Sequence, residues 1–115
     1  MAEDTIFGKI IRGEIPCDKV YEDDRYFAFY DINPAAPTHV LVIPKKPIPK
    51  VSDAEEADEA LLGGLVLCAN KVARQLGIAE GGYRMVINCG KAANQEVFHL
   101  HLHLLGGRDF TWPPG

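Results

Sequence analysis

The sequence predicts a single α+β domain, residues 1–115, with a mainly antiparallel sheet of about five strands and two helices. Several short stretches are rich in aromatic and β-branched residues or alternate apolar with polar ones, which is typical of strands. One longer stretch repeats its apolar residues every three or four positions, which is typical of an amphipathic helix. A chain of 115 residues is long enough for one packed core but not for two.

The N-terminal third predicts a short helix and a hairpin. Asp4 or Thr5 can cap the helix, because a side-chain oxygen accepts from the unpaired amides of a first turn, and Gly13 can end it. Residues 20–21 and 26–32 then predict two strands that are joined by a polar turn.

Residues 38–44 predict the next strand, in which His39, Leu41 and Ile43 share one face. A lone histidine at such a position is most simply a structural residue. If this strand pairs beside the other histidines of the chain, His39 instead becomes a partner that orients one of their rings.

The middle of the chain predicts one long core helix. Ser52 and Glu55 have the spacing of a capping box, and the apolar stripe that follows ends at Gly77. The acidic residues within 53–59 are then most simply a solvated face.

The last part of the chain predicts a strand at 83–88, a loop at 89–95 and a final strand at 98–105. The loop can offer backbone amides and the side chains of Asn88 and Gln95 to phosphate oxygens. Amide donors suit that task, because they bind an anion without neutralising a nearby imidazole.

The final strand holds three of the four histidines of the chain. Because strand side chains alternate between faces, His99, His101 and His103 would share one face while leucines pack on the other. One alternative is a half-buried strand whose polar face carries histidine by chance. Three imidazoles on one face favour a chemical role.

Strand geometry limits what these histidines can do together. Positions i and i+2 lie about 6.6 Å apart and positions i and i+4 about 13 Å apart, so the three rings cannot converge on one atom. A neighbouring pair could bind zinc only with ligands from elsewhere, and a zinc-binding module therefore stays an alternative. A division of roles along an extended anion such as a phosphate fits the spacing better.

The pattern from His99 to Leu105, histidine alternating with apolar residues, resembles the signature of the histidine triad superfamily of nucleotide hydrolases and transferases. The resemblance extends over the whole chain, in order, and is greatest to the nucleotide-binding Hint branch. The stretches that carry it are residues 4–11, 29–32, 36–39, 82–88 and 112–115.

The resemblance implies a hydrolase that cleaves nucleoside 5′-phosphoramidates or related mixed anhydrides. It implies that His101 attacks the α-phosphorus and forms a nucleotidyl-histidine intermediate, which water then hydrolyses to release the nucleoside monophosphate. His103 would bind a phosphate oxygen or assist the leaving group, while His99 and His39 would orient the site. Transferase relatives carry glutamine at the position of His103, so this histidine favours hydrolysis.

The resemblance also implies a site for a purine nucleoside monophosphate-type ligand. In that comparison Asp31 accepts from the ribose diol, although from the sequence alone it is equally an ordinary turn carboxylate. Glu96 stands where animal relatives have serine, and its carboxylate would have to be protonated or work differently. The positions that match nucleotide-binding residues of the family are Ile6, Phe7, Ile10, Phe29, Asp31, Ile32, Asn88, Gln95 and Glu96.

Relatives with a similar ending pair as C2 homodimers that join their sheets, and their C-terminal tail lies close to the partner's site. The resemblance therefore implies that Trp112 contacts the partner's site. Trp112 is also a large apolar surface that should find a partner. A nucleotide-dependent interaction protein with incidental hydrolysis stays a second alternative to the enzyme.

Composition excludes several other classes. The net charge of −4 argues against a broad surface for nucleic acid polymers, and no apolar run approaches the length of a membrane span. The acidic N-terminus lacks the features of a secretory signal, so we expect a cytoplasmic protein. Three widely spaced cysteines predict reduced thiols rather than a disulfide framework or a structural zinc site, and we expect no required metal cofactor.

Overall fold

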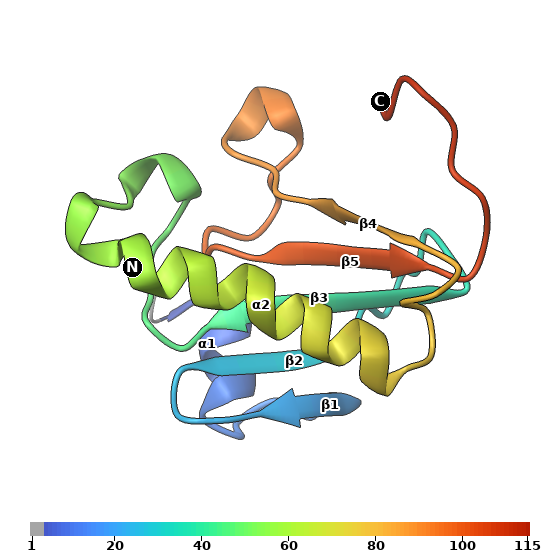
Figure 1. Cartoon of the computed structure of the whole chain (residues 1–115). Coiled ribbons are helices and arrows are strands. Elements are labelled where there is room, and N and C mark those ends of the chain that lie inside the picture. Colours follow the sequence, from blue (N-terminus) through green and yellow to red (C-terminus); the bar gives the residue numbers. More distant parts are fainter. Residues whose placement is uncertain (1–3) are drawn as a thin grey trace.

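The computed structural model describes residues 4–115 and contains one five-stranded sheet (Figure 1). The strands lie in the order β1-β2-β3-β5-β4, and each neighbouring pair is antiparallel. This confirms the predicted α+β class and the number of strands. The strands are β1 (Lys19–Glu22), β2 (Tyr26–Tyr30), β3 (Thr38–Pro44), β4 (Tyr83–Val86) and β5 (Leu102–Gly106).

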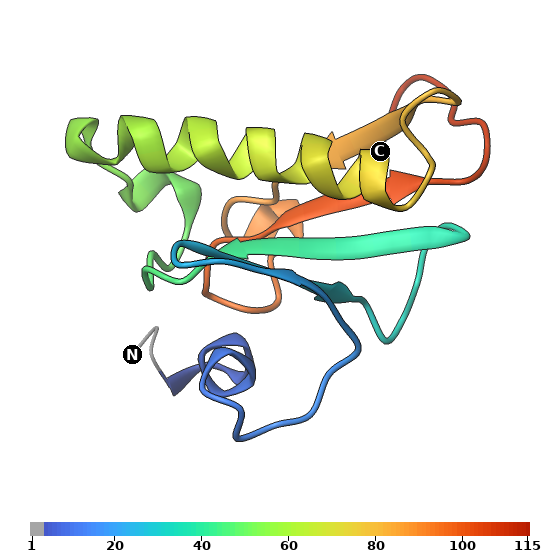
Figure 2. The same cartoon turned by 60° about the horizontal axis from the view of Figure 1, so that its bottom comes forward.

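The two predicted helices are α1 (Ile6–Ile11) and α2 (Glu59–Gln75), and they cover opposite faces of the sheet (Figure 2). Thr5 caps α1 as predicted, because its Oγ1 accepts from the amide of Gly8 at 3.2 Å. The short 3-10 turns η2 (Val51–Asp53), η3 (Glu56–Asp58) and η4 (Lys91–Ala93) lie in the connections.

The register between β3 and β5 places the histidines on the face that α1 covers. Leu41 pairs with His103 and His39 pairs with Leu105, so these four side chains share one face. The alternate residues face α2, as the apolar alternation predicts. They form the larger core with α2, which includes Val40, Val42, Leu100, Leu102 and Leu104.

The predicted capping box at Ser52 and Glu55 is wrong. The reciprocal pair is instead Glu55 and Asp58, which caps η3, and α2 begins only at Glu59. The cause is a contact with Lys46, which lies just after β3. The Asp58 carboxylate accepts from Lys46 Nζ at 2.6 Å and also from the Glu55 amide at 2.9 Å. Asp58 is therefore buried rather than part of a solvated acidic face.

Three predicted strands are too long. The strand predicted at 26–32 ends at Tyr30, where Asp31 turns the chain by accepting from the Asn33 amide at 2.8 Å. The strand predicted at 83–88 ends at Val86. The final strand begins at Leu102 rather than at residue 98, so His99 and His101 lie in an irregular approach to β5.

Two remaining features bear on the class of protein. No helix within residues 4–115 is long and apolar enough to cross a membrane. Cys17, Cys68 and Cys89 are free thiols, as predicted. The predictions that concern residues 1–3 lie outside the described part of the chain.

Candidate active site

A pocket of about 640 Å³ lies on the α1 side of the sheet, next to the histidines. This volume is within the range that ligand sites of proteins usually have. Its lining combines apolar side chains with polar ones and histidines, which suits a ligand that has a flat ring system and a charged group. The predicted residues that line the pocket are Ile6, Phe7, Ile10, Phe29, Asp31, Ile32, Asn88, Glu96, His101 and His103.

His101 has one tautomer in its neutral form. Its Nδ1 lies 2.8 Å from the carbonyl oxygen of His99, and a carbonyl only accepts, so Nδ1–H donates and Nε2 keeps its lone pair. Nε2 makes no hydrogen bond within residues 4–115. The ring is held edge-on against Phe7, with 5.1 Å between ring centroids, and it lines the pocket.

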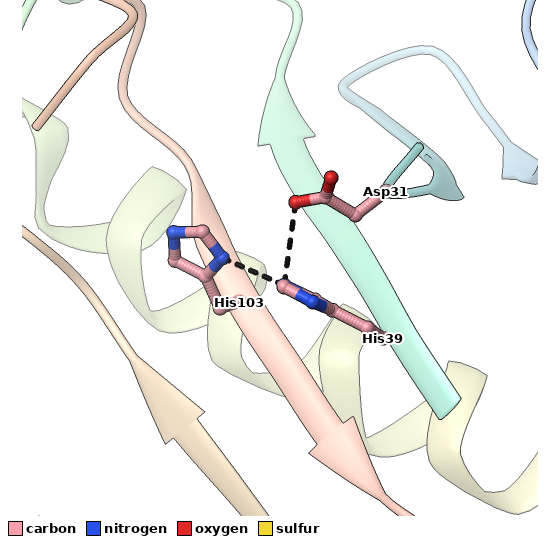
Figure 3. Close-up of side chains that lie close together, drawn as sticks. All are labelled: Asp31, His39 and His103. Carbon is pink, nitrogen blue, oxygen red and sulfur yellow. Dashed lines mark hydrogen bonds and ion pairs between the residues drawn. The ribbon is translucent and has the colours of Figure 1, made fainter. Parts of the chain in front are cut away.

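His103 is the neighbour of His101 in the pocket. Their ring centroids lie 5.0 Å apart and their planes are inclined by 67°. On its other side, Nδ1 of His103 lies 2.9 Å from Nε2 of His39, so β3 places His39 against one of the three histidines within residues 99–103 (Figure 3). The two rings share a hydrogen bond and therefore one proton.

His99 is buried and is not among the described residues that line the pocket. Its Nε2–H donates to the carbonyl oxygen of Pro44 at 2.7 Å, which ties the approach to β5 to the end of β3. Its Nδ1 has no hydrogen-bond partner within residues 4–115. His99 thus supports His101 through its own carbonyl group, not through its ring.

Burial keeps these imidazoles neutral. Loss of solvation lowers the pKa of His39, His99 and His101. Burial lowers the pKa of His103 to about 4, and the nearby rings of His101 and His39 act in the same direction. At neutral pH the site therefore offers lone pairs and N–H donors rather than imidazolium charges.

Asp31, His39 and His103 form a cluster in which one ligand atom of each lies within 4.8 Å of the others (Figure 3). The distances would suit a metal ion, but the hydrogen bonds of His39 do not. Its Nδ1 accepts from the Ala35 amide at 2.9 Å, so the neutral ring carries its proton on Nε2, the atom that faces the cluster. A metal ligand there would need a free lone pair. The cluster fits a hydrogen-bond relay better than a metal site.

The side chains on the segment before the three histidines, residues 88–96, point to different places. Asn88 and Glu96 line the pocket, whereas Gln95 is buried and holds the loop together. Gln95 Nε2 donates to the carbonyl oxygens of Pro49 and Val97, and its Oε1 accepts from the Gly90 amide at 2.8 Å.

Several lining residues were absent from the predicted set. Asn94 is one of them, and its φ of 65° places it in the left-handed region, which asparagine tolerates better than most residues. The link between α1 and β1 also lines the pocket and carries no recognisable motif. It contributes Ile15, Pro16, Cys17 and Asp18. Trp112, 82% exposed, is not among the described lining residues.

The comparisons with known proteins agree with this geometry. An uncharacterized HIT-like protein of Synechocystis is 63% identical over 115 residues and is covered completely, as is this chain. A HIT family hydrolase from Legionella pneumophila superposes with a TM-score of 0.95 at 50% identity, covering 97% of this chain and 100% of that one.

A histidine triad nucleotide-binding protein from Candida albicans superposes with a TM-score of 0.81 at 34% identity, covering 96% of this chain and 83% of that one. Residues 12–110 match the HIT domain family, and this range includes β1 to β5 and all four histidines. The chain therefore belongs to the HIT domain family.

Proposed function

We propose that the chain is a nucleotide-binding hydrolase that cleaves nucleoside 5′-phosphoramidates or related mixed anhydrides through a nucleotidyl-histidine on His101. The observation that carries this proposal is the state of the His101 ring. Its Nδ1–H is held by the His99 carbonyl group, and its Nε2 lone pair is free on a ring that lines the pocket. A neutral imidazole in this arrangement is a competent nucleophile.

The reaction would take two displacements. In the first, His101 Nε2 bonds to the α-phosphorus, the P–N bond breaks, and the leaving nitrogen takes up a proton from solvent and departs as an amine. In the second, water attacks the phosphorus and returns a proton to solvent, the bond to Nε2 breaks, and the nucleoside monophosphate is released. The His99 carbonyl oxygen stabilises the positive charge that His101 carries in between, because Nδ1–H keeps donating to it.

The pocket suggests how a nucleotide would lie. The apolar lining residues Ile6, Phe7, Ile10 and Phe29 would hold the base, and Ile32 is an exposed lining residue. Asp31 lines the same pocket, with Oδ2 3.4 Å from His39 Nε2, and its carboxylate could accept from the ribose diol. Asn88 and Glu96 would lie beside the phosphate and the leaving group, and Gln95 would act by fixing their loop.

We further infer a C2 homodimer in which two sheets join. β4 is an edge strand whose outer side pairs with no strand in the described part of the chain, and an open edge of this kind invites pairing with a second copy. The tail after β5 carries the exposed Trp112, which would then lie against the partner.

The test is hydrolysis of adenosine 5′-phosphoramidate by the EDTA-treated protein and by the His101→Ala variant, with AMP release followed over time. We expect metal-independent turnover in the unmodified protein and a loss of at least about a thousandfold in the variant. AMP binding measured by calorimetry shows that the variant remains folded. Turnover that survives in His101→Ala would refute covalent catalysis at this residue, and AMP binding without turnover in the unmodified protein would favour an interaction protein.

A further inference from the structure

We propose that the backbone amide of Ala35 is a positioning group that sets the tautomers of His39 and His103, so that His103 presents Nε2–H to a non-bridging oxygen of the reacting phosphate. The inference rests on the proposed function, because it assigns the direction of a hydrogen bond in that reaction. The Ala35 side chain takes no part.

The first step concerns His39. The Ala35 nitrogen lies 2.9 Å from His39 Nδ1, and a backbone amide can only donate a hydrogen bond. Nδ1 must therefore carry the lone pair. Since burial keeps this imidazole neutral, its single proton lies on Nε2.

The second step transfers this choice to His103. His39 Nε2 lies 2.9 Å from His103 Nδ1 and 3.4 Å from Asp31 Oδ2, so its proton is donated to the nearer His103 nitrogen (Figure 3). His103 Nδ1 is then an acceptor, and the proton of the neutral His103 ring lies on Nε2. That nitrogen is on the side of the ring away from His39.

The third step compares His103 with His101. The two rings are adjacent, yet their backbone partners select opposite tautomers: the His99 carbonyl oxygen leaves a lone pair on Nε2 of His101, and the Ala35 amide leaves a proton on Nε2 of His103. One ring can attack the phosphorus while the other donates to a phosphate oxygen. The reverse tautomer of His103 would set a lone pair against the anionic oxygens and would repel them.

The Ala35 amide is held in place without any contribution from a substrate. Arg108 Nη2 donates to the Ala35 carbonyl oxygen at 3.2 Å, which ties the loop to the segment after β5. The other end of the loop is fixed by the Asp31 amide, which donates to the His39 carbonyl oxygen at 3.0 Å. The donor is thus built into the fold, and a neutral donor fixed in advance is what stabilisation of transition-state charge requires.

The experiment replaces the Ala35 amide with an ester by incorporating lactic acid at this position, which removes the N–H and keeps the side chain. The matched control is the same replacement at Ala36, whose amide makes no hydrogen bond within residues 4–115. This ester weakens the Ala35 carbonyl oxygen as an acceptor for Arg108 but keeps the Ala35 N–H, so it separates the loss of the donor from a weaker tie of the loop. Long-range ¹H–¹⁵N NMR of the histidine rings reports each tautomer directly. Turnover of adenosine 5′-phosphoramidate reports the effect on the reaction.

We expect Nε2–H for His39 and His103 and Nδ1–H for His101 in the unmodified protein and in the Ala36 ester. In the Ala35 ester both His39 and His103 should shift toward Nδ1–H, and kcat should fall on the order of tenfold or more with a smaller change in KM. An unmodified protein with Nδ1–H on His103, or unchanged tautomers in the Ala35 ester, would overturn the inference.

The two proposals fail separately. If the unmodified protein shows the expected tautomers but does not hydrolyse the phosphoramidate, the proposed function fails and the positioning by Ala35 stands. If the Ala35 ester does not fold, the tautomers of the unmodified protein still decide the direction of the relay.

Discussion

His39 and His103 lie diagonally opposite each other on the antiparallel strands β3 and β5, with 2.9 Å between Nε2 of the first and Nδ1 of the second. His39 is buried and His103 is half-buried, and burial lowers the pKa of each. The site therefore depends on imidazoles that remain neutral, and this has consequences for stability as well as for chemistry.

The first consequence is a loss of stability in mild acid. An unfolded histidine titrates near 6.5 and the pKa of folded His103 is about 4, so below about pH 6.5 the unfolded state binds more protons and stability falls as the pH approaches 4. His103 alone should contribute up to about 3 kcal/mol of this loss. Urea denaturation at several pH values, with His103→Asn as the comparison, measures it. An equal loss in both proteins would contradict the assignment to His103.

Asp31 should matter more for ribonucleotides than for deoxyribonucleotides. Asp31→Asn keeps the oxygen that accepts from the Asn33 amide but removes the charge that would hold the ribose diol. We expect KM for adenosine 5′-phosphoramidate to rise about tenfold, with little change for the 2′-deoxy analogue. The exposed Asp24→Asn is the control. Equal changes for both substrates would show that Asp31 does not bind the ribose.

Glu96 should weaken nucleotide binding by repulsion. It is exposed and lines the pocket, so Glu96→Gln should tighten AMP binding by about two- to fivefold at low ionic strength, with the gain disappearing at high salt. Calorimetry at two salt concentrations measures this, with the distant, exposed Glu80→Gln as the control. Weaker binding in Glu96→Gln would mean that the carboxyl group donates a hydrogen bond to the nucleotide.

Two adjacent glycines of α2 should respond to alanine in opposite ways. A Cβ at Gly64 would collide with the Tyr26 hydroxyl, which donates to the Leu61 carbonyl oxygen at 2.7 Å, so Gly64→Ala should destabilise the fold by about 1–3 kcal/mol. Gly63 has no described atom within 4 Å of that position, and Gly63→Ala should stabilise by about 0.5–1 kcal/mol. Thermal unfolding of the pair checks this, and equal shifts would contradict the packing of α2 on β2.

The sequence predicts the fold well where local pattern and packing agree. The apolar alternation of Leu100, Leu102 and Leu104 correctly places these residues in one core, and β3 has the predicted bounds. Predictions fail where a distant partner decides the outcome. The start of α2 is shifted because Lys46 binds Asp58, a contact that no local spacing reveals.

The candidate site divides in the same way. The structure places Phe7 and Ile10 in the lining of the pocket and His39 in contact with His103, while the roles of these residues stay predictions. The Gln95 side chain turns away from the pocket because its amide donates to the Pro49 carbonyl oxygen. The tautomers of the histidines likewise depend on single backbone carbonyl and amide groups. Such partners cannot be identified from side-chain identities alone.

The measurement that tests the central claim most directly is the identification of the covalent intermediate. Adenosine 5′-phosphoramidate carrying a radioactive α-phosphate is mixed with excess protein, quenched under alkaline conditions within the first turnover, and the labelled peptide is sequenced by mass spectrometry. The account predicts one nucleotidyl group on His101, absent in His101→Ala and removed by water on longer incubation. A label on His103 or His99, or rapid AMP release that proceeds without any labelled protein, would contradict it.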